Sequence, residues 1–222
     1  RDYVPTFWNQ AIFDPFGFNG IGSTGNVARY VQVRQDNSIG YFLPSNLGGW
    51  YGQLMLAASE AGSSGDKGGR YVGGQIGFRA GPFDVAAAYA ELRAPAGKNK
   101  TTNVGGSWDF GFMKLMGYWD HERLPTSKET RGEIGAVIPF GQSEVRVGYD
   151  RSRLTPDVGA RTTLDNIKAT YQYNLSKRTA MYGTVARLSN KDSTTVSLPG
   201  AFFAPTAGGS SKGLEVGVRH FF

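Results

Sequence analysis

Few side chains in this sequence could do covalent chemistry, and none is placed as a catalyst would need. The chain has no cysteine and two histidines, His121 and His220, so thiol chemistry is excluded and the commonest general base is scarce. Asp120 and Glu122 form a carboxylate pair that we interpret as wall charges rather than a catalytic dyad. The glycine-rich residues 17–22 follow no predicted strand and precede no predicted helix, which speaks against a phosphate-binding loop. We predict no enzyme, no cofactor and no metal site.

The remaining charges are many and mixed in sign. The chain has 24 basic and 18 acidic residues, a formal net charge of +6, spread without a block of like charges. This pattern is typical of a solvated surface and predicts no nucleic-acid partner. The chemistry open to such residues is electrostatic, because charges facing one another across water set a field without breaking a bond.

These charges alternate with apolar residues at a period of two, which predicts β-strands with one apolar and one polar face. Glycine reaches 32 residues and aromatic residues 13%, as suits many strands joined by turns. We predict eleven strands, each of about ten residues, the length with which a tilted strand crosses a bilayer. Their ranges are 33–43, 50–58, 69–79, 83–93, 101–110, 112–123, 129–140, 142–152, 164–175, 179–189 and 212–222.

The predicted connections alternate between short and long along the chain. An outer-membrane barrel has this layout, with short turns on one rim and long loops on the other. The short ones are 45–49, 80–82, Gly111, Gly141 and 176–178, and the long ones are 60–68, 94–100, 124–128, 153–163 and 190–211. A loop as long as 190–211 would be unusual in a compact soluble sandwich.

Aromatic residues on the apolar faces are expected to form two rows that bound an apolar band. Such girdles lie at the headgroup level of transmembrane barrels. The row beside the short turns is Tyr41, Trp50, Phe78, Phe83, Phe110, Phe140, Tyr173 and Phe222, and the opposite row is Tyr89, Trp119 and Tyr149. No apolar run is long enough for a membrane helix, so strands must do the crossing.

Residues 1–28 have a different character. Pro5, Pro15 and the glycines of this stretch argue against a long helix. Its phenylalanines and tryptophan make it too apolar for a disordered tail. We expect a long loop that packs against the rest of the protein, with the barrel interior as the candidate surface.

Several stretches resemble the Gram-negative general diffusion porin family. Residues 1–6 and 14–17 resemble the loop that folds into the channel, and residues 34–41 resemble the strand after it. Residues 174–182 match the penultimate hairpin of the family, and residues 213–222 match its final strand. The resemblance extends over the whole chain.

The resemblance implies an all-β fold, a transmembrane antiparallel β-barrel of sixteen strands that forms homotrimers in the bacterial outer membrane. The eleven strands here would be the last eleven, so the chain would be the C-terminal two-thirds of such a porin. Residues 1–28 would be the inward-folded constriction loop, and residues 29–222 would be the strands and loops of the same single domain. Because an open sheet edge in lipid leaves backbone groups unpaired, missing N-terminal strands are expected partners, from the same gene or another polypeptide.

The C-terminus carries a further implication of the resemblance. In this family a terminal phenylalanine, with apolar residues at alternate positions before it, is read by the outer-membrane assembly machinery. Phe222, His220, Val218 and Val216 fit this assembly signal. His220 replaces the aromatic residue often found there but keeps a flat ring.

The implied function is passive diffusion of ions and small hydrophilic solutes through a water-filled lumen that the loop narrows. Alternation places Arg34, Arg131 and Lys168 on the lumen face near mid-strand, and Arg34 matches a pore-wall arginine of the family. The predicted pore constriction consists of Arg34, Arg131, Lys168, Arg146, Asp2 and Asp14. The cations at this level predict a weak anion preference. For each arginine, a salt bridge that braces the wall is an equally good expectation.

Three alternatives remain open at this stage. A substrate-specific outer-membrane channel would show saturable conductance with one solute. A soluble β-sandwich binding module would bury the apolar faces and dissolve without detergent. An autotransporter-type barrel would thread a helix through its pore, and the prolines and glycines of residues 1–28 speak against it.

Overall fold

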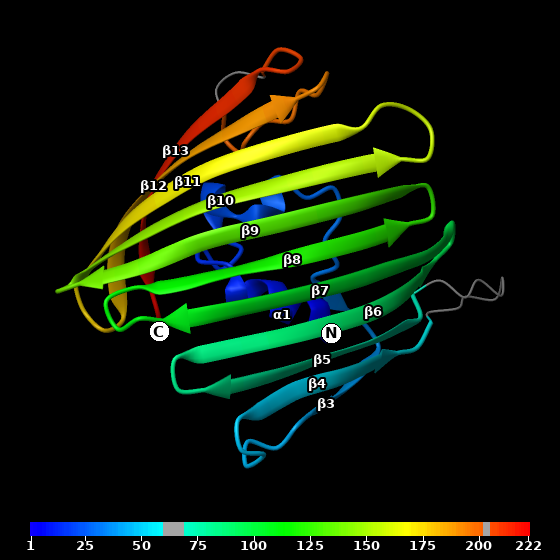
Figure 1. The fold of residues 1–222 in the computed structure, drawn as a ribbon, viewed down its shortest axis with the longest axis horizontal. Coiled ribbons are helices and arrows are strands. Elements are labelled where there is room, and N and C mark those ends of the chain that lie inside the picture. Colours follow the sequence, from blue (N-terminus) through cyan, green and yellow to red (C-terminus); the bar gives the residue numbers. More distant parts are fainter. Residues whose placement is uncertain (60–68, 202–204) are drawn as a thin grey trace.

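The structure, a computed structural model, describes residues 1–59, 69–201 and 205–222. Eleven strands form one antiparallel sheet in chain order, which curves around the N-terminal segment (Figure 1). They are β3 (Ser38–Phe42), β4 (Trp50–Ala57), β5 (Tyr71–Ala80), β6 (Phe83–Ala94), β7 (Gly97–Asp109), β8 (Lys114–Leu124), β9 (Ser127–Phe140), β10 (Ser143–Pro156), β11 (Thr162–Asn174), β12 (Thr179–Lys191) and β13 (Ser210–His220). The predicted number of strands and their antiparallel order are confirmed.

No helix among the described residues is both long enough and apolar enough to cross a membrane.

The prediction of one strand over residues 33–43 is wrong. Residues Arg34–Gln35 form β2, which pairs with β1 (Asp2–Tyr3) in a separate two-stranded ribbon, and only Ser38–Phe42 joins the large sheet. Asn37 separates the two parts with a φ of 48°. Asparagine tolerates this left-handed conformation better than most residues, so the chain can turn there.

The prediction of long connections at 94–100 and 124–128 is also wrong. β6 continues to Ala94 and β7 begins at Gly97, while β8 ends at Leu124 and β9 begins at Ser127, so both connections are two-residue turns. The strands extend because their polar ends keep pairing beyond the apolar band. The connection after β10 shortens to residues 157–161, the one after β12 remains long at 192–209, and residues 60–68 lie outside the described residues.

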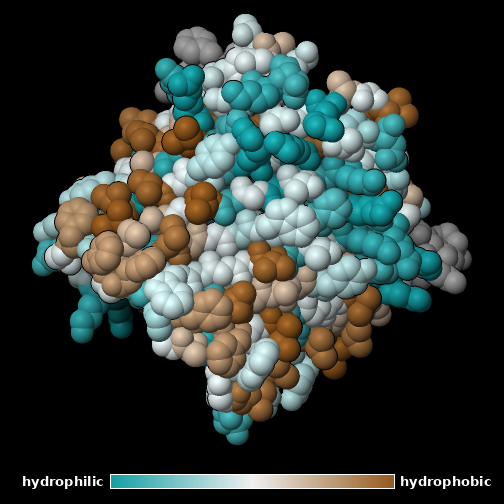
Figure 2. Space-filling view, in the orientation of Figure 1, coloured by the Kyte–Doolittle hydropathy of each residue, from teal (hydrophilic) through white to brown (hydrophobic). Residues whose placement is uncertain are grey.

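The two faces of the sheet have opposite character. Along β8, Leu115 and Trp119 are exposed while Tyr118, Asp120 and Glu122 are buried. Figure 2 shows the outward face, where an apolar region covers much of the sheet and a hydrophilic region lies at one end of the strands. Exposed apolar faces and buried carboxylates are the reverse of a soluble sandwich, so that alternative is wrong and lipid must cover the outer face.

The predicted aromatic rows lie on this outer face. Most of their members are exposed, among them Trp50, Phe140 and Tyr173 beside the short turns and Tyr89 and Trp119 at the other end. Rings in two rows with aliphatic side chains between them match the interfacial girdles of a membrane barrel.

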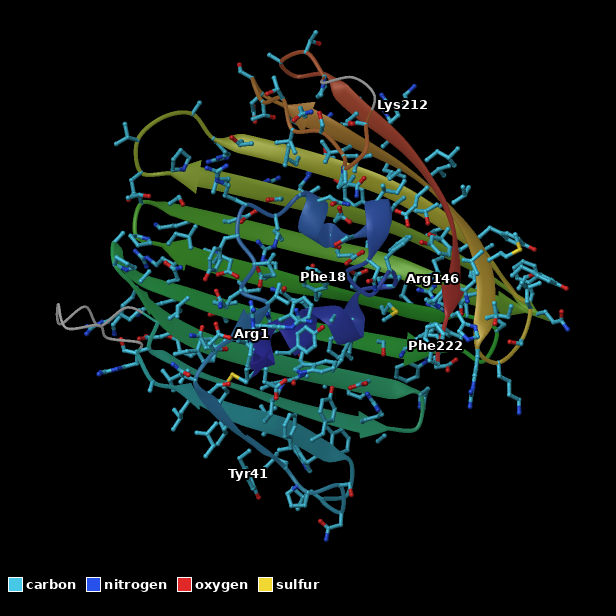
Figure 3. The ribbon with its side chains drawn as sticks, turned by 180° about the vertical axis from the view of Figure 1, so that it is seen from behind. Arg1, Phe18, Tyr41, Arg146, Lys212 and Phe222 are labelled. Carbon is cyan, nitrogen blue, oxygen red and sulfur yellow. The ribbon has the colours of Figure 1, made fainter. Side chains whose placement is uncertain are left out.

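The N-terminal segment lies on the concave face of the sheet (Figure 3). It contains α1 (Pro5–Phe13), followed by two short 3-10 turns, η1 (Gly20–Gly22) and η2 (Thr24–Asn26). The expectation of a plain loop missed α1. Pro5 occupies the first turn of this helix, where its missing N–H costs nothing, so proline marks the start of α1 and does not interrupt it.

The sheet does not close on itself. β3 and β13 are its outer strands, and within the described residues each pairs on one side only.

Candidate pore-lining site

α1 lies against the inner wall through side-chain amides. Asn9 donates to the Oδ1 of Asn103 at 2.8 Å, and Gln75 donates to the Oδ1 of Asn9 at 3.0 Å. Gln10 donates to Asp120 of β8. These groups are almost fully buried, where an unpaired amide would cost free energy, so the bonds fix the position of the helix on the wall.

The first charged cluster lies beside α1 and centres on Arg131 of β9. Its guanidinium is 2.5 Å from Asp120, 3.0 Å from Glu129 and 3.5 Å from Glu122. Glu129 also accepts the backbone N–H of Arg29 at 2.9 Å, so the cluster holds the chain as it leaves the N-terminal segment. All four ionisable side chains are at most 1% exposed.

The second charged cluster lies under η2 and centres on Lys168 of β11. Its Nζ is 2.5 Å from Asp150 and 2.7 Å from Glu133. The Thr24 hydroxyl bridges the two charges, because it donates to Glu133 at 2.6 Å and accepts from Lys168 at 3.0 Å. The ring of Phe16 covers the ammonium group at 4.6 Å, which completes its removal from water.

The turn between α1 and η1 is held by a carboxylate of the turn itself and by side chains of the wall. Asp14 accepts the backbone N–H groups of Phe16 at 2.7 Å and Phe18 at 2.9 Å. Glu215 of β13 accepts the N–H of Ile21 at 2.7 Å, and Arg146 of β10 donates to the carbonyl of Pro15 at 3.0 Å. Strands β10 and β13 therefore both hold the tip of the segment.

Carboxylates outnumber cations in the buried zone beneath the segment. The buried acids are Asp14, Asp120, Glu122, Glu129, Glu133 and Asp150, and the buried cations are Arg131 and Lys168. Backbone N–H groups, side-chain amides and hydroxyls also donate hydrogen bonds to these carboxyl groups. The segment thus covers these carboxyl groups and separates them from the lumen.

The six residues predicted at the constriction fall into two sets. Arg131 and Lys168 of the wall and Asp14 of the segment are at most 3% exposed, and they lie where the N-terminal segment packs against the wall. Arg34, Arg146 and Asp2 reach solvent on the concave side. The guanidinium of Arg34 donates to the Tyr3 hydroxyl and lies 4.2 Å from the Tyr3 ring, while Arg146 bonds Glu144 at 2.6 Å.

Sequence reasoning missed several residues of this site. Glu129 precedes Arg131 by two positions on β9, so the period of two would have placed it on the same face. No such signal exists for Asn9, Gln10 and Thr24. Contacts between the N-terminal segment and strands far away in the sequence produce no periodic pattern in the segment or in the strands.

A hollow of about 550 Å³ opens beside the tip of the segment on the concave side. Strands β10 to β13 supply Arg146, Thr170, Tyr182, Glu215 and Arg219 to its lining. Arg146 and the C-terminal Phe222 flank this region in Figure 3. Its lining mixes these polar and charged side chains with the apolar side chains of Phe16, Val218 and Phe221.

Residues 196–198 of the connection after β12 pack inward. Leu198 is 2% exposed and forms an apolar cluster with Ile21 and Val27 of the N-terminal part and Leu164 and Leu188 of the wall. Asn190 fixes the start of this connection by accepting the N–H of Val196 at 2.8 Å.

A curved antiparallel sheet with an apolar outside, a polar inside and a segment folded on its inner wall defines the class of transmembrane β-barrels with a water-filled lumen. A model of the Gram-negative porin family matches residues 1–193 of the chain. The chain belongs to this family, and its place is the bacterial outer membrane.

Individual relatives agree with this placement. Outer membrane porin protein 32 of Delftia acidovorans is 32% identical over 247 residues, covering 100% of this chain and 69% of the relative. The anion-selective porin from Comamonas acidovorans superimposes with a TM-score of 0.85 at 28% identity, over 100% of this chain and 72% of that one. OmpT of Vibrio cholerae shares the fold, with a TM-score of 0.75 at 12% identity over 100% of this chain and 74% of that one. The predicted family, fold class and membrane are confirmed, and the family indicates a channel rather than an enzyme.

Proposed function

We propose that the chain lines a water-filled channel through which ions and small hydrophilic solutes diffuse passively, with a preference for anions. The observation that carries the preference is how the inward-facing charges divide between buried and exposed positions. Six carboxyl groups beneath the N-terminal segment are buried and engaged, while Asp2 is exposed and Glu215 is half-buried. The guanidinium groups of Arg29, Arg34 and Arg219 are exposed on the concave side. A mobile anion therefore meets accessible guanidinium groups, and the covered acids repel it less than exposed acids would.

Two further observations support this proposal. Two of the accessible acids, Asp36 and Glu144, are paired with Arg1 at 3.3 Å and Arg146 at 2.6 Å. The similar solved structure from Comamonas acidovorans is described as anion-selective.

Planar-bilayer recording of the assembled porin tests the channel proposal. We expect stepwise conductance that rises linearly with salt concentration and a reversal potential in a salt gradient on the anion-selective side. Conductance that saturates with one solute would favour the substrate-specific channel instead. Cation selectivity would contradict the assigned preference.

We propose separate roles for the six constriction residues. Arg131 and Lys168 brace the N-terminal segment against the wall, and Asp14 shapes its turn. Arg34, Arg146 and Asp2 face the permeating ions. This division follows from burial, because residues at most 3% exposed lie at the contact between the segment and the wall and not in the lumen.

We further propose how the sheet is completed in the membrane. Additional strands must pair with β3 and β13, because lipid offers no hydrogen bonds to a free sheet edge. The closed barrel would assemble as a homotrimer, in keeping with the trimer form of OmpT, which shares its fold.

The C-terminus supports the proposed assembly signal. Val216, Val218 and Phe222 are exposed, and the rings of His220 and Phe222 meet edge to face at 4.8 Å. An exposed apolar strand end of this kind is available to the outer-membrane assembly machinery before lipid covers it.

A further inference from the structure

The open side of α1 is apolar, although it faces the concave side of the sheet. The opposite side of the helix, with Asn9 and Gln10, is buried against the wall. Helical spacing places four apolar residues on the open side, each half-buried or exposed, and they are Phe7, Trp8, Ala11 and Ile12. A surface helix normally directs its apolar side chains to the protein and its polar side chains to water, so packing alone does not account for this reversal.

Aromatic rings extend this apolar side in both directions along the N-terminal segment. Phe7 stacks on Tyr3 with ring centroids 5.3 Å apart, and Trp8 meets Tyr3 at a steep angle with centroids 5.4 Å apart. Phe18 meets Phe7 edge to face at 5.2 Å, and Figure 3 shows Phe18 on the concave side of the sheet. We call Tyr3, Phe7, Trp8 and Phe18 the lumenal aromatic track.

Wall packing explains part of this track and leaves Trp8 over. Phe7 and Phe18 each pack against an apolar cluster of the wall. The apolar clusters that the structure describes do not include Trp8, which is 38% exposed. An accessible indole ring offers a flat face on which another ring can stack.

Arg34 supplies a positive charge at one end of the track. It lies directly opposite Tyr3 in the β1–β2 ribbon, and its guanidinium is 4.2 Å from the centroid of the Tyr3 ring. Among the described residues no ion pair involves Arg34. The nearby acids have other partners, because Asp2 accepts the backbone N–H of Tyr3 at 2.7 Å and Asp36 pairs with Arg1 at 3.3 Å. A guanidinium has five N–H donors, so Arg34 keeps several for an anion.

We propose that the lumenal aromatic track and Arg34 form a binding site for solutes that join a planar aromatic ring to a carboxylate. The solute ring stacks on Trp8 while its carboxylate meets Arg34, and Tyr3 contacts both of these side chains. Chloride would use the cation without the rings, and an uncharged ring would use the rings without the cation. The inference rests on the proposed channel function, because solutes reach the track only through the lumen.

Planar-bilayer recording of the assembled porin, with chloride carrying the current, provides the test. The chloride conductance is recorded first, and benzoate, cyclohexanecarboxylate or benzamide is then added at increasing concentration. Benzoate has both features of the ligand, cyclohexanecarboxylate has the charge without the aromatic ring, and benzamide has the ring without the charge. The concentration of each probe that halves the current measures its binding.

We expect benzoate to halve the current at a lower concentration than the other two probes. Trp8→Leu should raise this concentration about twofold to tenfold, the range expected for one aromatic contact, and bring benzoate to the level of cyclohexanecarboxylate. Trp8→Phe keeps a ring and should retain the preference for benzoate. Arg34→Gln should weaken benzoate and cyclohexanecarboxylate alike and leave benzamide as it was.

Trp108→Leu is the matched control, because it removes the same ring from the outward face of β7, where Trp108 is 45% exposed. An equal weakening of benzoate in Trp8→Leu and Trp108→Leu would overturn the site, as would equal block by benzoate and cyclohexanecarboxylate in the unaltered protein. Block by benzamide as strong as that by benzoate would overturn the anionic ligand. Failure of the proposed channel function is a separate result, because no chloride current would then appear before any probe is added.

Discussion

Individual charged residues show why parity alone could not define the constriction. Arg131 and Lys168 are on the predicted face of the sheet, but the N-terminal segment covers both of them. Their cost of desolvation is offset by two carboxylates within 3.0 Å of each cation. These residues are therefore best tested through stability, and the exposed arginines through selectivity.

Lys168→Met should destabilise the porin by about 3 kcal/mol or more, because it leaves Asp150 and Glu133 buried without their cation. Denaturant unfolding of the assembled protein measures the change. Adding Asp150→Asn to this variant should recover part of the loss, since one of the uncompensated charges is then removed. Lys177→Met, at an exposed turn, is the control and should have little effect; an equal loss there would contradict the bracing role.

Arg34→Glu should lower the anion-to-cation permeability ratio, because it replaces an accessible positive charge near the N-terminal segment with a negative one. The reversal potential in a potassium chloride gradient measures this ratio. Arg153→Glu makes the same charge change on the outward face and should leave the potential where it was. An unchanged potential in Arg34→Glu would remove this residue from the ion pathway.

At the level of elements, the strands were predictable and the N-terminal helix was not. A period of two specifies strand, face and register together, as in β8, where exposed Trp119 alternates with buried Asp120. α1 directs amide side chains such as Asn9 towards the wall, whereas an ordinary amphipathic helix directs apolar side chains to the surface it packs on. The hydrophobic pattern of the sequence therefore did not predict this helix. The strand ends were misjudged for a related reason, because polar residues beyond the apolar band still pair.

α1 packs so closely on β7 that a larger side chain at the contact should displace the helix. An added Cβ at Gly105 would lie 2.2 Å from the buried ring of Phe13. Gly105→Ala should therefore displace α1 towards the lumen and lower the single-channel conductance. Gly132→Ala is the matched control, because a Cβ there meets its nearest neighbour at 3.9 Å, and its conductance should be unchanged.

At the scale of the whole molecule, the sheet is an incomplete cylinder whose final strand carries the proposed assembly signal. Phe222→Ala should reduce the amount of folded porin in the outer membrane, because the apolar strand end loses its terminal ring. The molecules that do assemble should keep their conductance, since Phe222 contacts neither charged cluster. Immunoblots of outer-membrane fractions and bilayer recording measure the two effects, and a normal membrane level would argue against the signal.

The inward packing of Leu198, in the connection after β12, has a consequence for how such a porin evolves. This connection lies on the outer rim, where phages and antibodies would act on it, yet Leu198 is packed against Ile21 beside the narrowing of the pore. A substitution near Leu198 that is selected because it prevents phage or antibody binding would thus also shift the N-terminal segment, which we propose to narrow the pore. Under the proposed function, escape from recognition and the passage of solutes would be coupled through Leu198 and the residues packed around it.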